Sequence, residues 1–368
     1  MSIDISTLKI LSYAVKALPE INFNTITPIS STANIDHYML HCDENATEYI
    51  IAVPKNSNGK SENYLFYSII SNLTKYNNLK YDTDDVNTAR YSAYGSEHAK
   101  SNTSMDLLNK IEFPKFYFPK INTDNFFSDN DEFIIIYSKP FGNKINLHDV
   151  SSELVLRIAD LYTVFHYLPI DIIPKEFHPD NIKHNIRNQL AKILKTVCNS
   201  NQFEVPLMVK NHFENYIMSE EFFSFTPSII TPNLPKLLVI DDLNMIKGIT
   251  QCTNMQISDP ALDLSYFTIG LGRHDIEQFY IEYRKKRNDM DDIHLEERVR
   301  FYEDFKVILD INTELLSGHI TKETLLELEK FEIALNIKIN ATLEKKQRIA
   351  ENKEKLTDFF ETEVIDMS

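Results

Sequence analysis

The sequence predicts an α+β protein of two lobes, with an antiparallel sheet in the N-terminal lobe and a mainly helical C-terminal lobe. Three observations lead to this prediction. Apolar runs separated by polar turns occupy residues 21–54, which is typical of a strand meander. A continuous apolar run at 132–137 is followed by a Pro-Phe-Gly sequence at 140–142, which indicates a break in the chain direction. After two further short apolar runs within 237–249, helical periodicity continues to the end of the chain.

The N-terminal lobe is expected to span residues 1–137. A helix is expected over residues 1–20, because Leu8, Leu11, Ala14 and Leu18 share one helical face. The strands of the meander are expected at 21–29, 37–42 and 49–54. Ser61 is a suitable N-cap for a helix that carries Leu65, Ile69 and Leu73 on one side. Residues 75–130 are rich in Asn, Asp, Ser and Tyr and lack periodicity, so we expect an irregular insertion there.

The C-terminal lobe is expected to span residues 138–368, beginning with a hinge near 138–143. Ser152 is expected to cap a helix that ends near Leu168 and Pro169. Two more helices should precede a hairpin at 237–249, whose tip carries Asp241, Asp242 and Asn244. The final helices are rich in Glu and Lys at i, i+4 spacing, which usually marks a solvated face.

Composition excludes several classes of function. The chain has 368 residues and a formal net charge of -16, which argues against nucleic-acid binding and against an anionic membrane surface. No run approaches the ~18 consecutive apolar residues of a membrane span, and the first residues lack the features of a signal peptide. The three cysteines are far apart in sequence and have no metal-ligand spacing. These features predict a cytoplasmic protein in a reducing compartment.

Four local patterns occur in a fixed order along the chain. They are the strand Tyr49–Lys55, the apolar run before the break at 140–142, the helix end 158–169, and the sequence Asp-Pro-Ala-Leu-Asp-Leu at 259–264. In this order they resemble the aminoglycoside phosphotransferase family. That resemblance implies a bilobal protein-kinase-like fold, with a nucleotide bound between the lobes and Tyr137 at the hinge.

The resemblance also identifies the positions that carry phosphoryl transfer in the family, and here their residues differ. Ala52 stands where the family has the basic residue that binds the nucleotide phosphates. Asn233 stands at the position of the catalytic base, and an amide cannot take up a proton near pH 7. Leu238 and Gln251 stand at the two metal-ligand positions, although Mg²⁺ prefers anionic oxygen ligands. The first turn, Ser30–Asn34, has no glycine for close approach to phosphates.

Other acidic residues have both structural and functional interpretations. The resemblance implies that Asp259 and Asp263 are structural, with Asp263 anchoring the backbone of the catalytic loop. Asp241 and Asp242 could be metal ligands, but their place at a hairpin tip favours turn formation. Glu62 could pair with a strand lysine, yet with Ala52 in the lysine position a favourable charge near a helix N-terminus is the simpler interpretation.

We therefore predict a catalytically degenerate phosphotransferase-like protein, a pseudokinase, that binds a nucleotide, a small molecule or a protein partner. If a nucleotide binds, ATP or GTP with Mg²⁺ is the expected cofactor. One alternative is an active ATP- or GTP-dependent small-molecule phosphotransferase with non-standard residues, in which Asp241, Asp242 or Asp259 would hold the metal. A second alternative is a structural interaction protein whose cleft is filled by side chains. Neither nucleic acid nor a membrane is an expected partner.

Overall fold

The computed structural model divides the chain into two compact units. One comprises Met1–Ile182 with Phe225–Leu295, and the other comprises Lys183–Ser224 with Glu296–Ser368. The division differs from the predicted boundary at 137/138, because four helices of the expected C-terminal lobe form a unit of their own. The structure describes residues 5–42, 48–81, 111, 115–117, 134–140, 142–146, 150–232, 234–250, 255–287 and 292–365.

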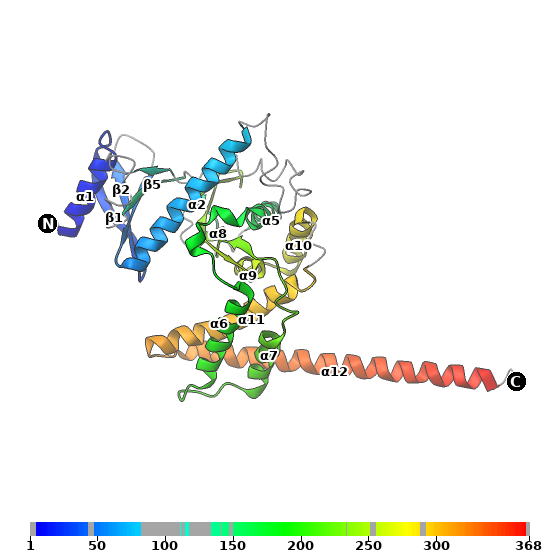
Figure 1. Ribbon diagram of the computed structural model, residues 1–368. Helices are drawn as coiled ribbons and strands as arrows, with labels where there is room; N and C mark the ends of the chain where they lie inside the picture. The colour runs from blue at the N-terminus through cyan, green and yellow to red at the C-terminus, as the bar shows by residue number, and fades with distance from the viewer. Residues whose placement is uncertain are drawn as a thin grey trace. The chain divides into compact units, whose positions relative to one another are not determined.

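The N-terminal part of the first unit is a five-stranded antiparallel sheet in the order β1-β2-β3-β5-β4 (Figure 1). Its strands are β1 (Phe23–Ser31), β2 (Ile35–Cys42), β3 (Glu48–Pro54), β4 (Phe116–Tyr117) and β5 (Ile135–Lys139). Helices α1 (Ile5–Ala17) and α2 (Ser57–Tyr81) lie on opposite sides of the sheet. The predicted meander and the predicted first helix are therefore confirmed, and β5 ends two residues later than expected.

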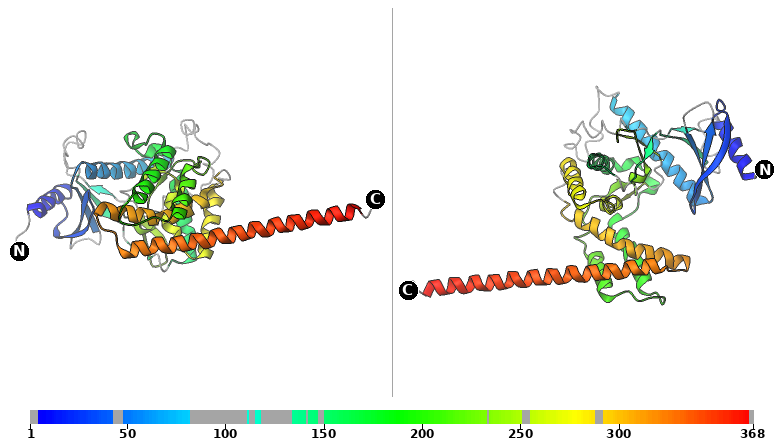
Figure 2. Two further views of the ribbon diagram at one scale, coloured as in Figure 1. Left: turned by 90° about the horizontal axis from the view of Figure 1, so that it is seen from below. Right: turned by 180° about the vertical axis from the view of Figure 1, so that it is seen from behind.

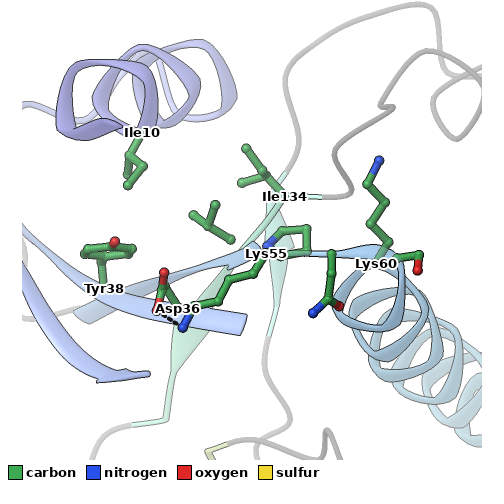
Figure 3. Close-up of a pocket in the computed structure, with 10 residues that line it drawn as sticks. Ile10, Asp36, Tyr38, Lys55, Lys60 and Ile134 are labelled. Carbon is green, nitrogen blue, oxygen red and sulfur yellow. Dashed lines mark ion pairs between the residues drawn. The ribbon is translucent and has the colours of Figure 1, made fainter. Parts of the chain in front are cut away.

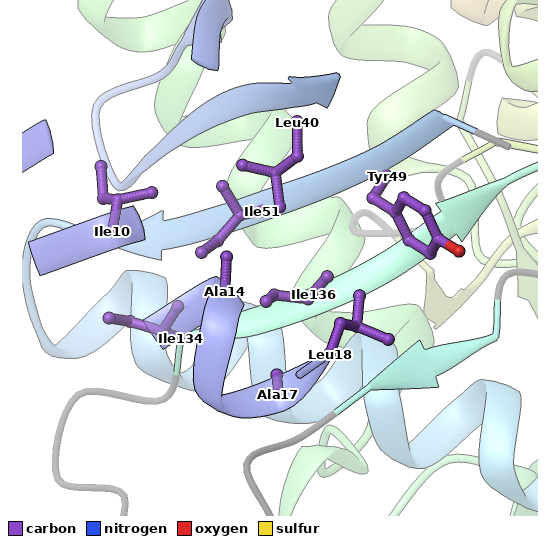
Figure 4. Packing of buried hydrophobic residues seen from close by; sticks show 9 residues of the cluster. All are labelled: Ile10, Ala14, Ala17, Leu18, Leu40, Tyr49, Ile51, Ile134 and Ile136. Carbon is purple, nitrogen blue, oxygen red and sulfur yellow. The ribbon is translucent and has the colours of Figure 1, made fainter. Parts of the chain in front are cut away.

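The sheet packs against α1 through an alternating set of apolar side chains. Ile51 of β3 and Ile136 of β5 are buried with Ala14 of α1, as Figure 4 shows. Because successive strand residues point to opposite faces, their neighbours Ala52 and Ile135 point away from α1. We call the face that packs against α1 the outer face and the face that carries Ala52 the inner face.

Helix α2 begins earlier than predicted. Asn56 is the N-cap, since its Oδ1 accepts a hydrogen bond from Gly59 N at 3.0 Å. The predicted cap, Ser61, lies inside the helix, where its hydroxyl donates to Ser57 O at 3.2 Å. Helix α2 continues to Tyr81, so the first part of the predicted irregular insertion is helical. Most of the remainder of 75–130 lies outside the described residues.

The rest of the first unit contains two small sheets among helices. Helix α5 (Ser152–Tyr167) is capped by Ser151 rather than Ser152, because Ser151 Oγ accepts from Leu154 N at 3.3 Å. The sheets are β10-β7 and β6-β8-β9. The remaining elements are β6 (Asn143–Lys144), η3 (Ile170–Ile172), η4 (Lys175–Phe177), β7 (Ser228–Ile230), α8 (Leu234–Leu237), β8 (Leu238–Ile240), β9 (Ile246–Ile249), β10 (Gln256–Ser258), α9 (Pro260–Thr268) and α10 (Arg273–Arg287).

The predicted hairpin is present as β8 and β9, and Asp241 forms its turn. Asp241 Oδ1 accepts hydrogen bonds from Leu243 N at 3.0 Å and Met245 N at 2.8 Å. Asn244 has a φ of 57°, a left-handed conformation that Asn tolerates better than most residues. The hydrogen bond from Met245 N is the main reason that the pKa of Asp241 lies below its ordinary value.

The second unit consists of α6 (Ile182–Cys198), α7 (Leu207–Met218), α11 (Leu295–Ser317) and α12 (Lys322–Ile365). Aromatic rings form much of its core, with Phe213 stacked on Phe331 at a centroid distance of 5.4 Å. The fully buried Arg298 donates to Phe222 O at 3.3 Å. Helix α12 has 44 residues against 23 in α11 (Figure 2). None of the helices that the structure describes combines the length and apolarity needed to cross a membrane.

The close contact between Gly59 and Asn34 gives a testable prediction. A Cβ atom at Gly59 would overlap Asn34 O, which is a backbone atom and cannot rotate away. Gly59→Ala should therefore lower the free energy of unfolding by about 1–3 kcal/mol, although alanine normally favours a helix. Urea unfolding measures the difference. Gly270→Ala is the matched control, because its nearest neighbour would lie at 3.9 Å. Equal stability of the two variants would contradict the contact.

Candidate functional site

The phosphate-binding position predicted from the sequence lies in the middle of the inner face. Ala52 pairs with His37 of β2 on one side and with Ile135 of β5 on the other. Ala52 is 0% exposed and His37 is 4% exposed. A methyl group, an imidazole and a sec-butyl group therefore lie side by side where the resemblance implies a basic residue. The position offers no amine to a nucleotide phosphate.

Asn63 of α2 lies against Ala52 and was missed by the sequence analysis. Its Nδ2 donates to Ala52 O at 3.1 Å, and the residue is 0% exposed. Glu62, which we had considered as a lysine partner, instead accepts from Asn34 Nδ2 at 2.6 Å. A neutral side-chain-to-backbone hydrogen bond thus connects α2 and β3. The sequence signal was available, because Asn63 shares the apolar helical face of Phe66 and Ile70.

The turn between β1 and β2 is held by the side chain of Lys55, which directly follows β3. Lys55 Nζ donates to Ser31 Oγ at 2.6 Å and to Thr32 O at 2.7 Å. The same ammonium group forms an ion pair with Asp36 at 2.9 Å (Figure 3). Lys55 is the lysine nearest to Ala52 in sequence, and these three contacts occupy it at the turn and the outer face.

The predicted catalytic loop follows β7 and is anchored through its backbone. Thr231 N donates to Asp263 Oδ2 at 2.7 Å, and Leu234 N donates to Thr231 O at 2.9 Å. Thr250 N donates to Leu237 O at 2.7 Å. These hydrogen bonds fix the described residues that neighbour the two predicted positions, Asn233 and Gln251. Asn233 and Gln251 themselves lie outside the described residues.

Leu238, at the first of the predicted metal-ligand positions, is part of the hydrophobic core. It begins β8, pairs with Ile249 of β9 and is 0% exposed. A buried hydrocarbon side chain has no oxygen to offer a cation. Of the four predicted positions, the two that the structure describes, Ala52 and Leu238, therefore do not fit a magnesium nucleotide.

Asp263 connects three elements of the first unit. Besides Thr231 N, its Oδ2 lies 3.3 Å from His166 Nε2 of α5. The other ring nitrogen of His166 lies 2.7 Å from the hydroxyl of Tyr283 in α10. Burial, followed by the nearby Asp263 carboxylate, raises the pKa of Tyr162 well above its ordinary value. These contacts are the ones that an anchoring role for Asp263 requires.

Asp259 also has a structural contact. Its Oδ1 accepts from Ala261 N at 2.9 Å and caps α9, whose first residue is Pro260. Asp259 is fully buried. Its carboxylate therefore stabilises the start of the helix that carries Asp263.

Tyr137, which the resemblance places at the hinge, lies in the strand that leads into the predicted hinge region. It is inside β5, is fully buried, and packs edge-to-face against Phe66 of α2 at a centroid distance of 5.2 Å. The connection to the next part of the unit begins only after Lys139, because β5 continues two residues beyond Tyr137. Tyr137 is thus a core residue under α2, two residues before the end of β5.

Of the two alternative metal ligands at the hairpin tip, Asp241 is already engaged and Asp242 has one longer contact. Asp241 accepts two backbone hydrogen bonds and lies 3.0 Å from Lys247 Nζ. Asp242 Oδ1 lies 3.5 Å from Asn143 Nδ2. Within the described parts of the chain, no group of three His, Cys, Asp or Glu side chains could hold a metal ion.

The fold is that of known antibiotic phosphotransferases. The structure of APH(2")-IIia with GDP and kanamycin superimposes with a TM-score of 0.61 and 15% identity, covering 89% of this chain and 99% of that one. A macrolide 2'-phosphotransferase type I gives 0.58 and 12%, covering 89% and 97%. Macrolide 2'-phosphotransferase MphH from Brachybacterium faecium gives 0.57 and 11%, covering 87% and 97%.

Comparison of the sequence, by contrast, finds no relative. Protein-family models give no match, and a search of curated proteins gives none. The structural comparisons nevertheless extend over most of the chain, and they confirm the predicted α+β, protein-kinase-like fold with its antiparallel N-terminal sheet. The chain thus has the kinase-like fold of the aminoglycoside and macrolide phosphotransferases.

The contacts of Asp263 predict a large loss of stability when the carboxylate is removed. Asp263→Ala leaves Thr231 N and His166 without their buried partner, and should lower the free energy of unfolding by about 2–5 kcal/mol. Asp242→Ala, at an exposed turn, should change it by about 0.5 kcal/mol or less. Chemical denaturation of both variants tests the anchor. Similar losses of unfolding free energy in the two variants would contradict the anchoring role of Asp263.

His37 predicts a specific pH dependence. Burial lowers the pKa of His37 below its ordinary value, so the unfolded chain binds this proton at a higher pH than the folded chain. Its contribution to stability is complete above the unfolded pKa of about 6.5 and is lost as the pH falls from there toward the folded pKa. His37→Gln should therefore lose less stability than the parent between pH 7 and pH 5. His274→Gln, at an exposed position, should behave as the parent does.

Proposed function

We propose that this chain is a catalytically degenerate phosphotransferase-like protein that acts by binding rather than by transferring phosphate. The observation that carries the proposal is the pair of Ala52 and Asn63. A hydrogen bond from an amide to a backbone carbonyl connects α2 and β3 here. Protein kinases have a lysine–carboxylate ion pair between the corresponding elements, and that lysine contacts the nucleotide phosphates. The uncharged pair of Ala52 and Asn63 supplies neither the lysine that would contact the phosphates nor the carboxylate that would pair with that lysine.

The burial of the inner face favours the same conclusion. His37, Ala52 and Asn63 are all buried within the first unit. Burial lowers the pKa of His37, which favours the neutral imidazole, so this residue does not replace the missing positive charge at neutral pH. The ligand of such a protein would be a nucleotide, another small molecule or a protein partner that does not need a magnesium ion.

The active-enzyme alternative needs a metal site built from other residues. Asp241 is engaged in the turn of the hairpin and Asp259 caps α9. That leaves Asp242 among the acidic residues considered from the sequence. A single carboxylate is a weak magnesium site, because Mg²⁺ in phosphotransferases is held by two protein ligands and the phosphates. The structural likeness to antibiotic phosphotransferases is what supports this alternative, and the residues at the predicted phosphate and metal positions are what weigh against it.

The proposal predicts that the parent protein lacks phosphate transfer. With ATP or GTP and Mg²⁺, the purified chain should not phosphorylate aminoglycosides or macrolides above background. The loss of a positioned base alone typically costs about 10²–10⁴ in rate. Turnover that is abolished by Asp242→Ala would contradict the proposal and establish the active-enzyme alternative.

A restoration experiment tests the assignment of position 52, in a variant that also rebuilds the other three predicted positions and a carboxylate on α2. A variant that rebuilds the clamp, the base and the metal ligands should gain magnesium-dependent nucleotide binding over the parent in calorimetry. Its substitutions are Ala52→Lys, Asn63→Glu, Asn233→Asp, Leu238→Asn and Gln251→Asp. The matched control carries Ala52→Met instead of Ala52→Lys, which keeps the length of the side chain and removes its charge. If the folded five-fold variant binds no better than this control, the assignment of position 52 is wrong.

A further inference from the structure

The solvent-facing side of helix α12 carries a line of aliphatic side chains. Leu326, Ile333 and Ile337 are 49%, 55% and 65% exposed. Their spacing of seven and four residues places them on one face of the helix. Single exposed apolar residues are ordinary on protein surfaces, whereas an aligned set indicates an interaction surface. We call these three residues the α12 stripe.

The α12 stripe lies opposite the face by which α12 packs within the second unit. Leu328 and Leu335 are buried, and Phe331 stacks on Phe213 of α7. At 3.6 residues per turn, these packed positions lie roughly half a turn around the helix from the stripe. Helix α12 is therefore apolar on two sides, and a partner can reach the second side without displacing α7.

Helix stability does not account for the isoleucines of the stripe. Isoleucine is β-branched and loses side-chain freedom in a helix, so Glu, Lys and Gln are more favourable at exposed positions. The exposed positions between Leu326 and Ile333 follow that preference, since they are Glu327, Glu329 and Lys330. Burial against a partner gives the aliphatic side chains of the stripe a role that exposure to water does not.

The charges beside the stripe make α12 complementary to a second copy of itself. On one flank, Glu323 and Glu327 lie ten and six residues before Ile333. On the same flank, Lys338 and Lys345 lie five and twelve residues after it. A two-fold axis through the middle of the stripe runs two copies antiparallel and brings this flank of each copy beside the same flank of the other. The glutamates of each copy then face the lysines of its partner.

Two of these four charges also have contacts within the chain. Glu327 pairs with Lys330 at 2.7 Å, and both side chains are exposed. Lys338 lies near Asp304 of α11, where burial raises the pKa of the carboxyl and the lysine charge partly offsets that rise. Ion pairs on an exposed surface are weak, so the Glu327 carboxylate can exchange one lysine for another when a partner arrives.

We propose that the α12 stripe is a homodimer interface, through which two copies of this chain pair antiparallel. Leu326 of one copy packs near Ile337 of the other, and the two Ile333 side chains lie near the two-fold axis. The stripe is short, and interfaces below about 1,200 Å² are typically weak, so the dimer should dissociate in the micromolar range. The proposal does not depend on nucleotide binding, because the stripe contains none of the predicted phosphotransfer positions.

Sedimentation equilibrium of the full-length chain between about 1 and 200 µM measures the dimer. Ile333→Gln together with Ile337→Gln should raise the dissociation constant by at least about 10-fold, because glutamine preserves the helix and removes the apolar contact. The matched control is Ile269→Gln with Ile281→Gln, at isoleucines of the first unit that are 55% and 59% exposed. This control should leave the constant within about 2-fold of the parent.

A charge exchange tests the antiparallel arrangement. Glu323→Lys should weaken the dimer by about 2- to 5-fold, because it places a like charge opposite Lys345 of the other copy. Adding Lys345→Glu to the same chain should return the constant to within about 2-fold of the parent. No return would overturn the antiparallel pairing.

Three results would overturn the interface itself. They are a parent that stays monomeric at the highest concentration, a glutamine variant of the stripe that dimerises as the parent does, and a control pair that weakens the dimer equally. Thermal melting establishes that each variant is folded.

Discussion

The first unit depends on the buried carboxylate of Asp263. One of its oxygens accepts a hydrogen bond from Thr231 N and lies within reach of His166, so it fixes the loop after β7 relative to α5 and α9. A charged acceptor in the interior is unfavourable without partners, and these contacts offset that cost. Asp259 stabilises the start of the same helix, which keeps Asp263 in position. Two aspartates four residues apart, Asp259 and Asp263, thus serve one structural purpose.

The positions predicted to carry phosphate chemistry and the contacts that stabilise the fold involve different residues. The complexes of APH(2")-IIia and APH(2")-IIa, two phosphotransferases of this fold, contain a nucleotide together with an antibiotic. Here Ala52 and Leu238, at two of the positions predicted from the sequence to bind phosphate and metal, are buried. Burying hydrocarbon in place of a charged or polar group is often neutral or stabilising. Phosphate chemistry would require charged or polar side chains at these two positions, whereas packing in the core favours apolar side chains.

Much of the fold could be predicted from the sequence, because it follows local rules. The apolar runs of β2 and β3, the helical face of α5 and the turn at Asp241 all depend on residues near one another in the chain. The anchoring role of Asp263 came from resemblance alone. The second unit could not be predicted, because α6 and α7 pack with helices about a hundred residues later. The role of Asn63 needed the register between α2 and β3, which no local pattern determines.

Several of the contacts described above share a form: a side chain bonds to a backbone group. Asn63 binds Ala52 O, Asp263 binds Thr231 N, and Thr250 binds Leu237 O. Such a bond restricts the identity of only one of the two residues, because every residue type except proline offers the same main-chain groups. The partner is free to diverge over evolutionary time without disturbing the architecture. Contacts of this form help to explain how a chain can share only 11–16% of its residues with structures whose fold it retains.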